Sequence, residues 1–298
     1  MRSLMRRLAP KRTRIGVRPH LEFLKWGLTP IRVGAFAVAA LGALTAAAQT
    51  VPASRQLPGV AYDMRMSTTA AAMGNMTQGF TGHAVSAGGR GRIDIVDGGM
   101  MLFGKGDYML FDSTGVTVVR PATHEYVALS SELADNEQLG ALFKSITLSD
   151  VKALLDSLPG SDTVAGYPTR HFRMTLAVNM SIDASMAQQR MATESITDYW
   201  IANVPGLPNN PLVRANTVVP MGAASGPFKA LNAKVDSLAA RMGTATALRT
   251  KTVSRLILGP GQATTTEQSS EVTNIRHVNV DEASLAIPAG YRKTSIRG

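Results

Sequence analysis

The strongest constraint on the fold is an alternation of apolar and polar residues, with a period of two, that returns in segment after segment. In the first of these segments Val60, Tyr62, Met64 and Met66 alternate with residues such as Asp63. This period is typical of a β-strand with one buried face and one solvated face. We therefore expect the domain to be mainly β.

A β-hairpin is predicted next along the chain. The run Asp107–Asp112 and the run Val116–Val119 are rich in β-forming residues, and the short segment Ser113–Gly115 joins them. Two such runs around a glycine-containing turn indicate antiparallel pairing. Further strands, spaced as in an antiparallel meander, are predicted at 80–95, 125–129, 172–178, 193–204, 246–258 and 264–280.

Two segments change to the helical period. Ser149 as an N-cap, leucines three or four residues apart, and the stop Pro159–Gly160 predict a helix over 149–158. A second helix is predicted over Pro227–Met242, because its apolar residues fall on one helical face. These residues are Phe228, Leu231, Val235, Leu238 and Met242.

The segment Val33–Ala48 predicts export. It is apolar and uncharged, ends on the small residues Ala46 and Ala48, and follows nine Lys and Arg residues with the single acid Glu22. A basic region, a short apolar region and a small-residue end are typical of a secretory signal cleaved after Ala48. The alternative is a retained membrane anchor, although the apolar run is shorter than the roughly 20 residues that a spanning helix needs.

This interpretation divides the chain into a signal segment, 1–48, a linker, 49–58, and a single domain, 59–298. The predicted location is the periplasm or another exported site, with the protein soluble after cleavage. Contact with the membrane is expected only through an uncleaved leader.

Charge argues against a nucleic-acid partner. The chain has 31 Lys and Arg residues against 21 Asp and Glu residues. Nine of the basic residues and one acidic residue precede Val33, so 22 and 20 remain beyond the leader. Positive charge before an apolar segment is explained by membrane topology, and no basic patch with interleaved aromatics is left to bind phosphates.

The sequence offers little for catalysis. Cysteine is absent, which excludes disulfides, thiolate metal ligands and a cysteine nucleophile. No phosphate-binding loop, zinc-protease helix or Gly-x-Ser-x-Gly elbow occurs. The histidines beyond the leader, His83, His124, His171 and His277, have no metal-ligand spacing. Asp198 beside Trp200 is the best single candidate for a general acid. We predict a non-enzymatic protein without a cofactor or metal.

Several motifs, in their order along the chain, resemble a known group of proteins. They are GVAYDMRMSTT (59–69), GRGRIDIVDGG (89–99), DYMLFDSTGVTVVRPATHEYVAL (107–129), VAGYPTRHFRM (164–174), DYWIANVPG (198–206) and IPAGYRKT (287–294). In this order they are similar to a bacterial exported family of unknown function, which is itself similar to the LolA/LolB lipoprotein-carrier superfamily. The segments Met180–Thr193 and Gly206–Ser225 depart from the carrier pattern as insertions.

The resemblance implies a fold and a function. The implied fold is a curved, incompletely closed antiparallel β-barrel with covering helices, an α+β arrangement that is mainly β. The implied function is a carrier of an apolar ligand, an acyl chain or a lipoprotein. The alternative is an envelope structural or protein-interaction module with a solid core and no ligand.

Strand alternation and the stripe of the second helix together give an expected ligand lining. The same side chains would form the solid core under the alternative function. They are Tyr62, Met64, Met66, Ile93, Ile95, Tyr108, Leu110, Phe172, Met174, Trp200, Leu231 and Val235.

Overall fold

The computed structural model describes residues 55–70, 76–100, 102–129, 145–184, 187–207, 228–259 and 261–295. All of them belong to the unit Thr50–Gly298. The predicted signal segment lies outside the described residues, and β1 begins at Gln56, inside the range assigned to the linker. Among the described helices, none has the length and apolar character to cross a membrane.

The described part of the chain is mainly β. The strands are β1 (Gln56–Ala70), β2 (Met76–Ala87), β3 (Arg90–Met100), β4 (Phe103–Gly104), β5 (Tyr108–Phe111), β6 (Val116–Arg120), β7 (Glu125–Ala128), β8 (Ile146–Leu158), β9 (Thr163–Val164), β10 (Tyr167–Pro168), β11 (Arg170–Ala184), β12 (Ala187–Ala202), β13 (Thr246–Gly259), β14 (Gln262–Asp281) and β15 (Arg292–Lys293). The helices are the α-helix α4 (Phe228–Arg241) and the short 3-10 helices η2 (Pro121–Thr123) and η3 (Glu282–Leu285).

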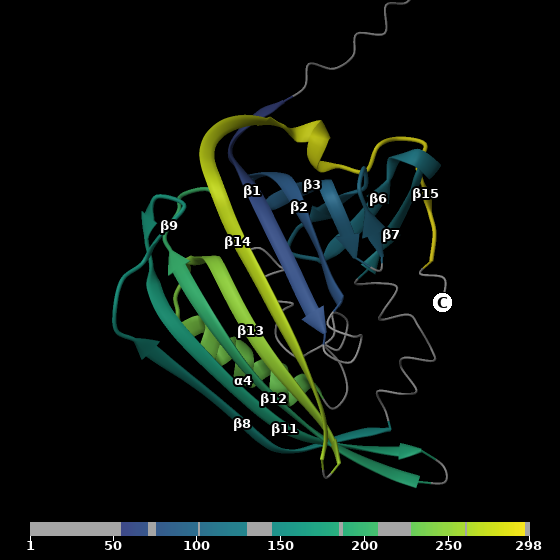
Figure 1. Cartoon of the computed structure of the whole chain (residues 1–298). Helices are drawn as coiled ribbons and strands as arrows, with labels where there is room; N and C mark the ends of the chain where they lie inside the picture. Colours follow the sequence, from purple (N-terminus) through teal and green to yellow (C-terminus); the bar gives the residue numbers. More distant parts are fainter. Residues whose placement is uncertain are drawn as a thin grey trace, which may run out of the picture. The chain divides into compact units, whose positions relative to one another are not determined.

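Thirteen strands form one sheet that does not close into a barrel. Their order is β15-β7-β6-β5-β3-β2-β1-β14-β13-β12-β11-β8, with β4 paired to β3. All pairs are antiparallel except β15 with β7. Strands β9 and β10 form a separate hairpin. The predicted antiparallel meander is thus confirmed, and the sheet curls along its length (Figure 1).

In the middle of the sheet, β1, the first strand of the described chain, pairs with β14, which lies near its C-terminal end. Strand β1 pairs with β14 from Gln56 opposite Asp281 to Ala70 opposite Thr266. Figure 1 shows β14 beside β1 and continuing beyond its end. This pairing connects the meander that begins at β1 with the meander that ends at β14.

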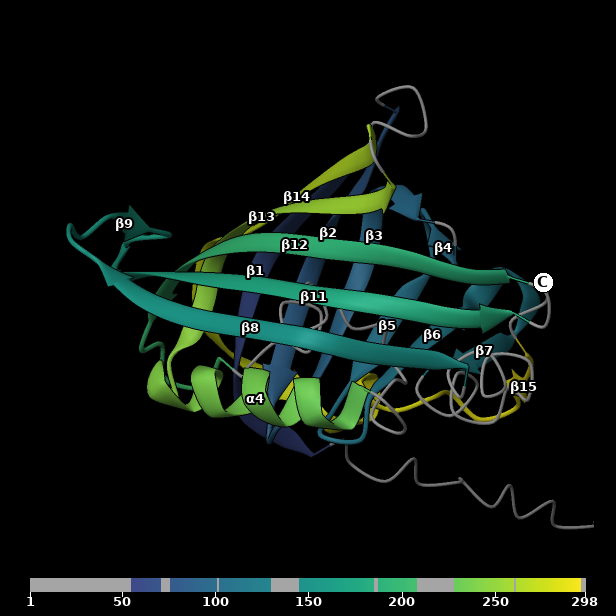
Figure 2. The same cartoon turned by 90° about the horizontal axis from the view of Figure 1, so that it is seen from below.

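The predicted helix over Pro227–Met242 is confirmed as α4. Phe228, Leu231 and Val235 are buried on one face of the helix. They pack against the apolar side chains of β8, β11 and β12, and Figure 2 shows α4 lying along β8 at the edge of the sheet. The amphipathic stripe therefore covers the sheet, as the spacing predicts.

The predicted helix over 149–158 is wrong, because this segment is strand β8. Leu155 lies opposite Met174 of β11, and Ala153 lies opposite Leu176. The side chains of Ala153 and Leu155 are buried, while Leu154 between them is 62% exposed. The same residues fit a period of two as well as a helical period, and pairing with β11 overrides the local capping signal. Among the described residues α4 is thus the single α-helix, where we expected two.

The predicted hairpin is confirmed as β5 and β6. The carboxylate of Asp112 accepts hydrogen bonds from the backbone N–H groups of Thr114 (2.7 Å) and Gly115 (3.2 Å) and fixes the turn. The expected insertion Met180–Thr193 continues β11 and β12, which pair up to Ala184 opposite Ala187. The second expected insertion, Gly206–Ser225, lies almost entirely outside the described residues.

Replacing an α4 residue that faces the sheet with a charged residue should destabilise the domain. We expect Leu231→Asp or Val235→Asp to lower the free energy of unfolding by several kcal/mol, because each buries a carboxylate without a partner. Urea denaturation followed by circular dichroism measures the change. Ala233→Asp, on the exposed side of α4, is the matched control. Unfolding midpoints equal to the parent's for both buried variants would show that α4 is not part of the core.

Candidate ligand-binding face

We call the face of the sheet that carries Tyr62, Met64 and Met66 the inner face. In an antiparallel sheet directly opposed residues point to the same side, so the strand register extends this face from strand to strand. One such row runs through Phe172, Tyr199, Thr250, Ser270, Met66 and Phe80. A second runs through Leu155, Met174, Thr197, Thr252, Gln268, Thr68 and Gln78.

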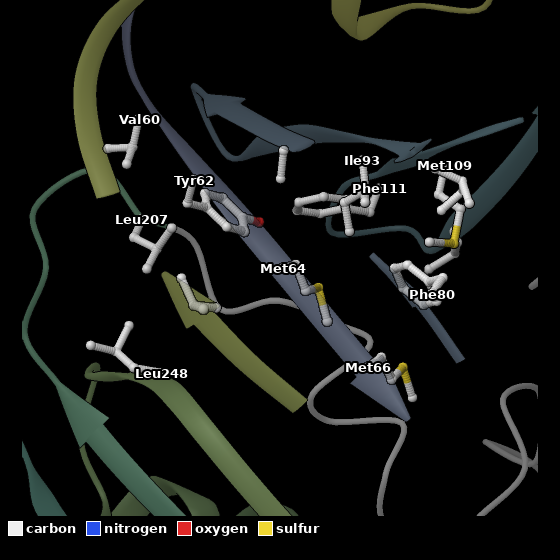
Figure 3. Close-up of a cluster of buried hydrophobic side chains, with 14 of the residues drawn as sticks. Val60, Tyr62, Met64, Met66, Phe80, Ile93, Met109, Phe111, Leu207 and Leu248 are labelled. Carbon is white, nitrogen blue, oxygen red and sulfur yellow. The ribbon is translucent and has the colours of Figure 1, made fainter. Parts of the chain in front are cut away.

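The first apolar cluster covers the inner face of β1, β2, β3, β5 and β6. Figure 3 shows side chains from these strands together with Leu207 and Leu248. Tyr62 and Met109 are almost fully buried. The ring of Phe111 lies over Gly91, where a Cβ atom would collide with it. Methionine is prominent in this cluster, through Met64, Met66 and Met109.

The second apolar cluster lies under α4. It joins Phe172, Met174 and Leu176 of β11 with Tyr199 and Ile201 of β12. Phe228, Leu231 and Val235 of α4 complete it, with Ala153 and Leu155 of β8. Both apolar clusters therefore lie on the same face of one sheet, and the first row runs from Phe172 of one cluster to Phe80 of the other.

Hydroxyl side chains separate the two apolar clusters. Cross-strand hydrogen bonds join Ser195 to Ser254 (3.1 Å), Thr197 to Thr252 (3.1 Å) and Thr250 to Ser270 (2.7 Å). We call these six residues the hydroxyl band. The side chains of all but Ser254 are at most 4% exposed.

The inner face carries charge outside the two rows given above, at Arg170 opposite Ile201 and at Arg120 opposite Glu125. The two rows given for the inner face contain no Asp, Glu, Lys or Arg. The neighbouring row on the other side of the sheet, which we call the outer face, runs through Asp156, Arg173, Asp198 and Lys251, with a charge at every position. These two inner rows are therefore uncharged, although Gln78 at the end of the second row is exposed, and the neighbouring outer row is charged.

Tyr62 carries a polar atom deep in the first apolar cluster. Its side chain is 1% exposed, and its hydroxyl has no hydrogen-bond partner among the described residues. Figure 3 shows the hydroxyl directed into the cluster. Burial raises the pKa of Tyr62 well above its ordinary value, so this hydroxyl is a neutral donor at physiological pH. The hydroxyl oxygens of Thr68 and Thr264 are also buried without a partner.

The outer face carries two Asp–His pairs. In the first, Asp63 Oδ1 lies 2.5 Å from His83 Nδ1, and Asn274 Nδ2 donates to Asp63 Oδ2 at 2.6 Å. The hydrogen bond from Asn274 lowers the pKa of Asp63, burial acts against it, and His83 adds to the lowering. Among the described residues no group of three His, Asp or Glu side chains could hold a metal ion.

The second pair includes Asp198, the predicted general acid. Burial raises the pKa of Asp198, but hydrogen bonds and charge from Arg173 and His171 outweigh it and lower the pKa overall. Arg173 donates two hydrogen bonds of 2.9 Å, and His171 Nε2 lies 3.1 Å from Oδ1. A carboxylate held ionised in this way is a poor proton donor, so the geometry does not support Asp198 as an acid.

Trp200 belongs to this outer group. Its ring stacks on His171 with the centroids 4.4 Å apart, and its indole N–H donates to Asp162 at 2.7 Å. The side chain is half-buried and touches the first apolar cluster, but it points away from the inner face. The register therefore places Trp200 on the outer face, apart from the lining residues with which the sequence grouped it.

Two open hollows are lined by described residues. One of about 560 Å³ lies beside Val60 of the inner face, between Pro58 and Gly206. The other, of about 440 Å³, lies between the β5–β6 hairpin and the segment after η3, and Arg90 and Asp112 line it. Both adjoin the first apolar cluster, the first hollow through Val60 and the second through Phe111 and Val116.

The twelve predicted lining residues divide into three groups. Five lie in the first apolar cluster, namely Tyr62, Met64, Met66, Ile93 and Ile95. Four lie in the second, namely Phe172, Met174, Leu231 and Val235. Tyr108 and Leu110 instead form an outer-face cluster with Val119, and Trp200 is also on the outer face. The structure thus places nine of the twelve on the inner face.

Sequence reasoning missed inner-face residues of β5 and of the hydroxyl band. Met109 and Phe111, not Tyr108 and Leu110, face inward, because Met109 lies opposite Ile93. All four residues of β5 are buried, so alternation could not show which pair faces inward. The hydroxyl band had a usable sequence signal, because Ser and Thr residues recur at every second position of β12 and β13.

Comparisons with known proteins give a distant structural similarity. No family model matches the chain, and no curated protein matches it. Among solved structures it is similar to the crystal structure of a LolA superfamily protein from Nitrosomonas europaea. The identity is 9%, the alignment covers 76% of this chain and 89% of that chain, and the TM-score is 0.31. At these values no residue role passes from that protein to this chain.

The ion pair of Asp198 should stabilise the fold except in acid. Because the pKa of Asp198 is lowered on folding, its contribution is present above the unfolded value, about 3.9, and is lost as the pH falls through the folded value. At pH 7 we expect Asp198→Asn to cost about 1–3 kcal/mol, and the cost should shrink in acid. Urea denaturation at several pH values measures it. The control, Asp156→Asn in the same outer row, should stay within about 0.5 kcal/mol of the parent. A cost for Asp198→Asn that does not change with pH would contradict this account.

Proposed function

We propose that the protein is a non-enzymatic binding or carrier protein for an apolar ligand, such as an acyl chain or a lipidated protein, held on the inner face. The observation that carries the proposal is the Tyr62 hydroxyl, buried in the first apolar cluster without a partner. Leaving such a group unsatisfied costs about 1–3 kcal/mol. A bound carbonyl or hydroxyl group would recover that cost.

The surroundings of Tyr62 fit this function. Met64, Met66 and Met109 lie in the same cluster, and flexible methionine side chains adapt to apolar partners of different shape. The inner rows carry no charge that would have to be desolvated when an acyl chain binds. The hollow beside Val60 opens next to this cluster and offers a route to it. Membership of the LolA-like superfamily, which the order of the sequence motifs predicts, is part of the same proposal.

The alternative function is an envelope structural or protein-interaction module without a ligand. Close packing of the first apolar cluster favours it, since Tyr62, Ile93 and Met109 are at most 1% exposed. Phe80 and Phe103 also pack edge to face, with ring centroids 5.3 Å apart. Ligand titration separates the two functions.

Export is the second part of the proposal. The basic and apolar pattern of residues 1–48 is that of a secretory signal, and the predicted location is the periplasm or another exported site. N-terminal sequencing of the protein from the cell envelope should begin near Gln49. A protein found in the cytosol with Met1 at its N-terminus would contradict export, and an envelope protein that keeps Met1 would indicate a retained anchor.

Ligand binding is tested with the neutral apolar dye 1-N-phenylnaphthylamine. We expect a saturable rise in fluorescence. Met66→Gln, which places an amide in the first apolar cluster, should weaken dye binding by about five- to thirtyfold, because an unsatisfied polar group replaces an apolar contact. Ile196→Gln, at a 43% exposed position on the outer face, is the matched control and should bind like the parent.

Thermal melting shows that the variants are folded before they are compared. Dye fluorescence that never saturates would contradict the carrier function and leave the solid-core alternative. An equal loss of binding in the Met66 and Ile196 variants would show that the dye does not bind at the inner face.

A further inference from the structure

The hydroxyl band forms a polar area on the inner face that adjoins the second apolar cluster and, in the first row, lies between the two apolar clusters. Along the second row, Met174 is followed by Thr197, Thr252, Gln268 and Thr68. Along the next row, Leu176 is followed by Ser195, Ser254 and Thr266. The polar side chains thus occupy consecutive strands, from β12 to β1, and consecutive rows. They form one continuous area and are not isolated substitutions.

A solid core does not need hydroxyl groups at these positions. Valine has nearly the shape of threonine and fits a buried strand without a polar atom to satisfy. Thr197, Thr250 and Thr252 are nonetheless at most 3% exposed. Their cross-strand hydrogen bonds lower the cost of burial, but a set of apolar side chains would avoid the cost. The presence of hydroxyl groups at these buried positions suggests that they bind a polar group of a ligand.

Unpartnered hydroxyls border the band. The hydroxyl of Thr68, in the same row as Thr252, is buried without a partner, and so is the hydroxyl of Thr264 two residues beyond Thr266. Tyr62 provides a third unpartnered hydroxyl on the same face. Buried polar groups in proteins are almost always hydrogen-bonded. Three exceptions on one face indicate donors and acceptors that a ligand would satisfy.

The absence of charge from these rows restricts the chemistry of that ligand. A carboxylate or phosphate buried here would find no Lys or Arg in either of the two inner rows, whereas the outer row carries Arg173 and Lys251. Burying an ion without a partner is strongly unfavourable. The hydroxyl band therefore fits a polar group that is uncharged and rich in oxygen.

We propose that the ligand is a neutral amphiphile, whose ester, amide or hydroxyl groups bind the hydroxyl band while its apolar chain lies on the adjoining apolar clusters. This inference rests on the proposed function, since it names the class of ligand that the same face takes. The inference predicts that the inner face binds a neutral acylglycerol or a glycolipid-like molecule more tightly than a free fatty acid or a phospholipid with an anionic head group.

Isothermal titration calorimetry tests the inference with three lauroyl amphiphiles, each used below its micelle concentration. They are 1-monolauroylglycerol, laurate and lauroyl lysophosphatidylglycerol. We expect monolauroylglycerol to bind at least about tenfold more tightly than either anion. Equal or tighter binding of an anion would overturn the inference, while the carrier function would stand. No binding of any of the three would overturn both.

A pair of variants locates the polar contact. The double variant Thr197→Val/Thr252→Val removes both partners of one hydrogen bond and keeps their shape, so it should fold like the parent. We expect it to bind monolauroylglycerol about fivefold or more weakly and 1-N-phenylnaphthylamine, which lacks a polar head, as the parent does. Thr175→Val, on the outer face between Met174 and Leu176, is the control and should change neither. Unchanged binding of monolauroylglycerol by the double variant would contradict the assignment to the band.

Discussion

The pairing of β1 with β14 is the interaction on which the rest of the structure depends. Without it the sheet would separate into two meanders, one from β1 to β15 and one from β14 to β8. The pairing is irregular at one point, where the register shifts between Ala61 and Asp63. Asn274 adopts a left-handed conformation there, with φ 53°, and donates a hydrogen bond to Asp63. This bulge fixes the register at the centre of the sheet.

Register decides what each face can do, because a slip of one residue moves every side chain of a strand to the other face. In the observed register Met66, Ser270 and Thr250 face inward, while Arg65, Glu271 and Arg249 face outward. Arg249 and Glu271 form an ion pair of 2.6 Å on the outer face. The separation of the uncharged inner rows from the charged outer row, and with it the proposed ligand chemistry, follows from this single register.

Much of the fold could be predicted from the sequence, because local patterns determine it. The alternation of β1, the turn at Asp112–Gly115 and the stripe of α4 are short-range signals, and the structure confirms each of them. The segment 149–158 failed because its leucines satisfy both a helical and a strand period, and only pairing with the distant β11 selects the strand.

The candidate site was predicted less completely, for a different physical reason. Its members come together through pairings between residues far apart in the chain, such as Met66 with Ser270. Where consecutive residues are all apolar, as in β5 or around Trp200, the sequence does not show which side faces inward. A bulge next to Trp200 complicates the alternation further. The hydroxyl band could be recognised as a surface only once the order of β12, β13, β14 and β1 was known.

Native mass spectrometry of the protein isolated from the envelope of the cells that make it tests the central claim most directly. If the inner face is a binding site, the folded protein should carry an additional mass of one neutral amphiphile. That mass should disappear on denaturation and appear in the organic extract. A folded protein whose mass is that of the polypeptide alone, in preparations never exposed to detergent, would contradict the account and show that the inner face is a closed core.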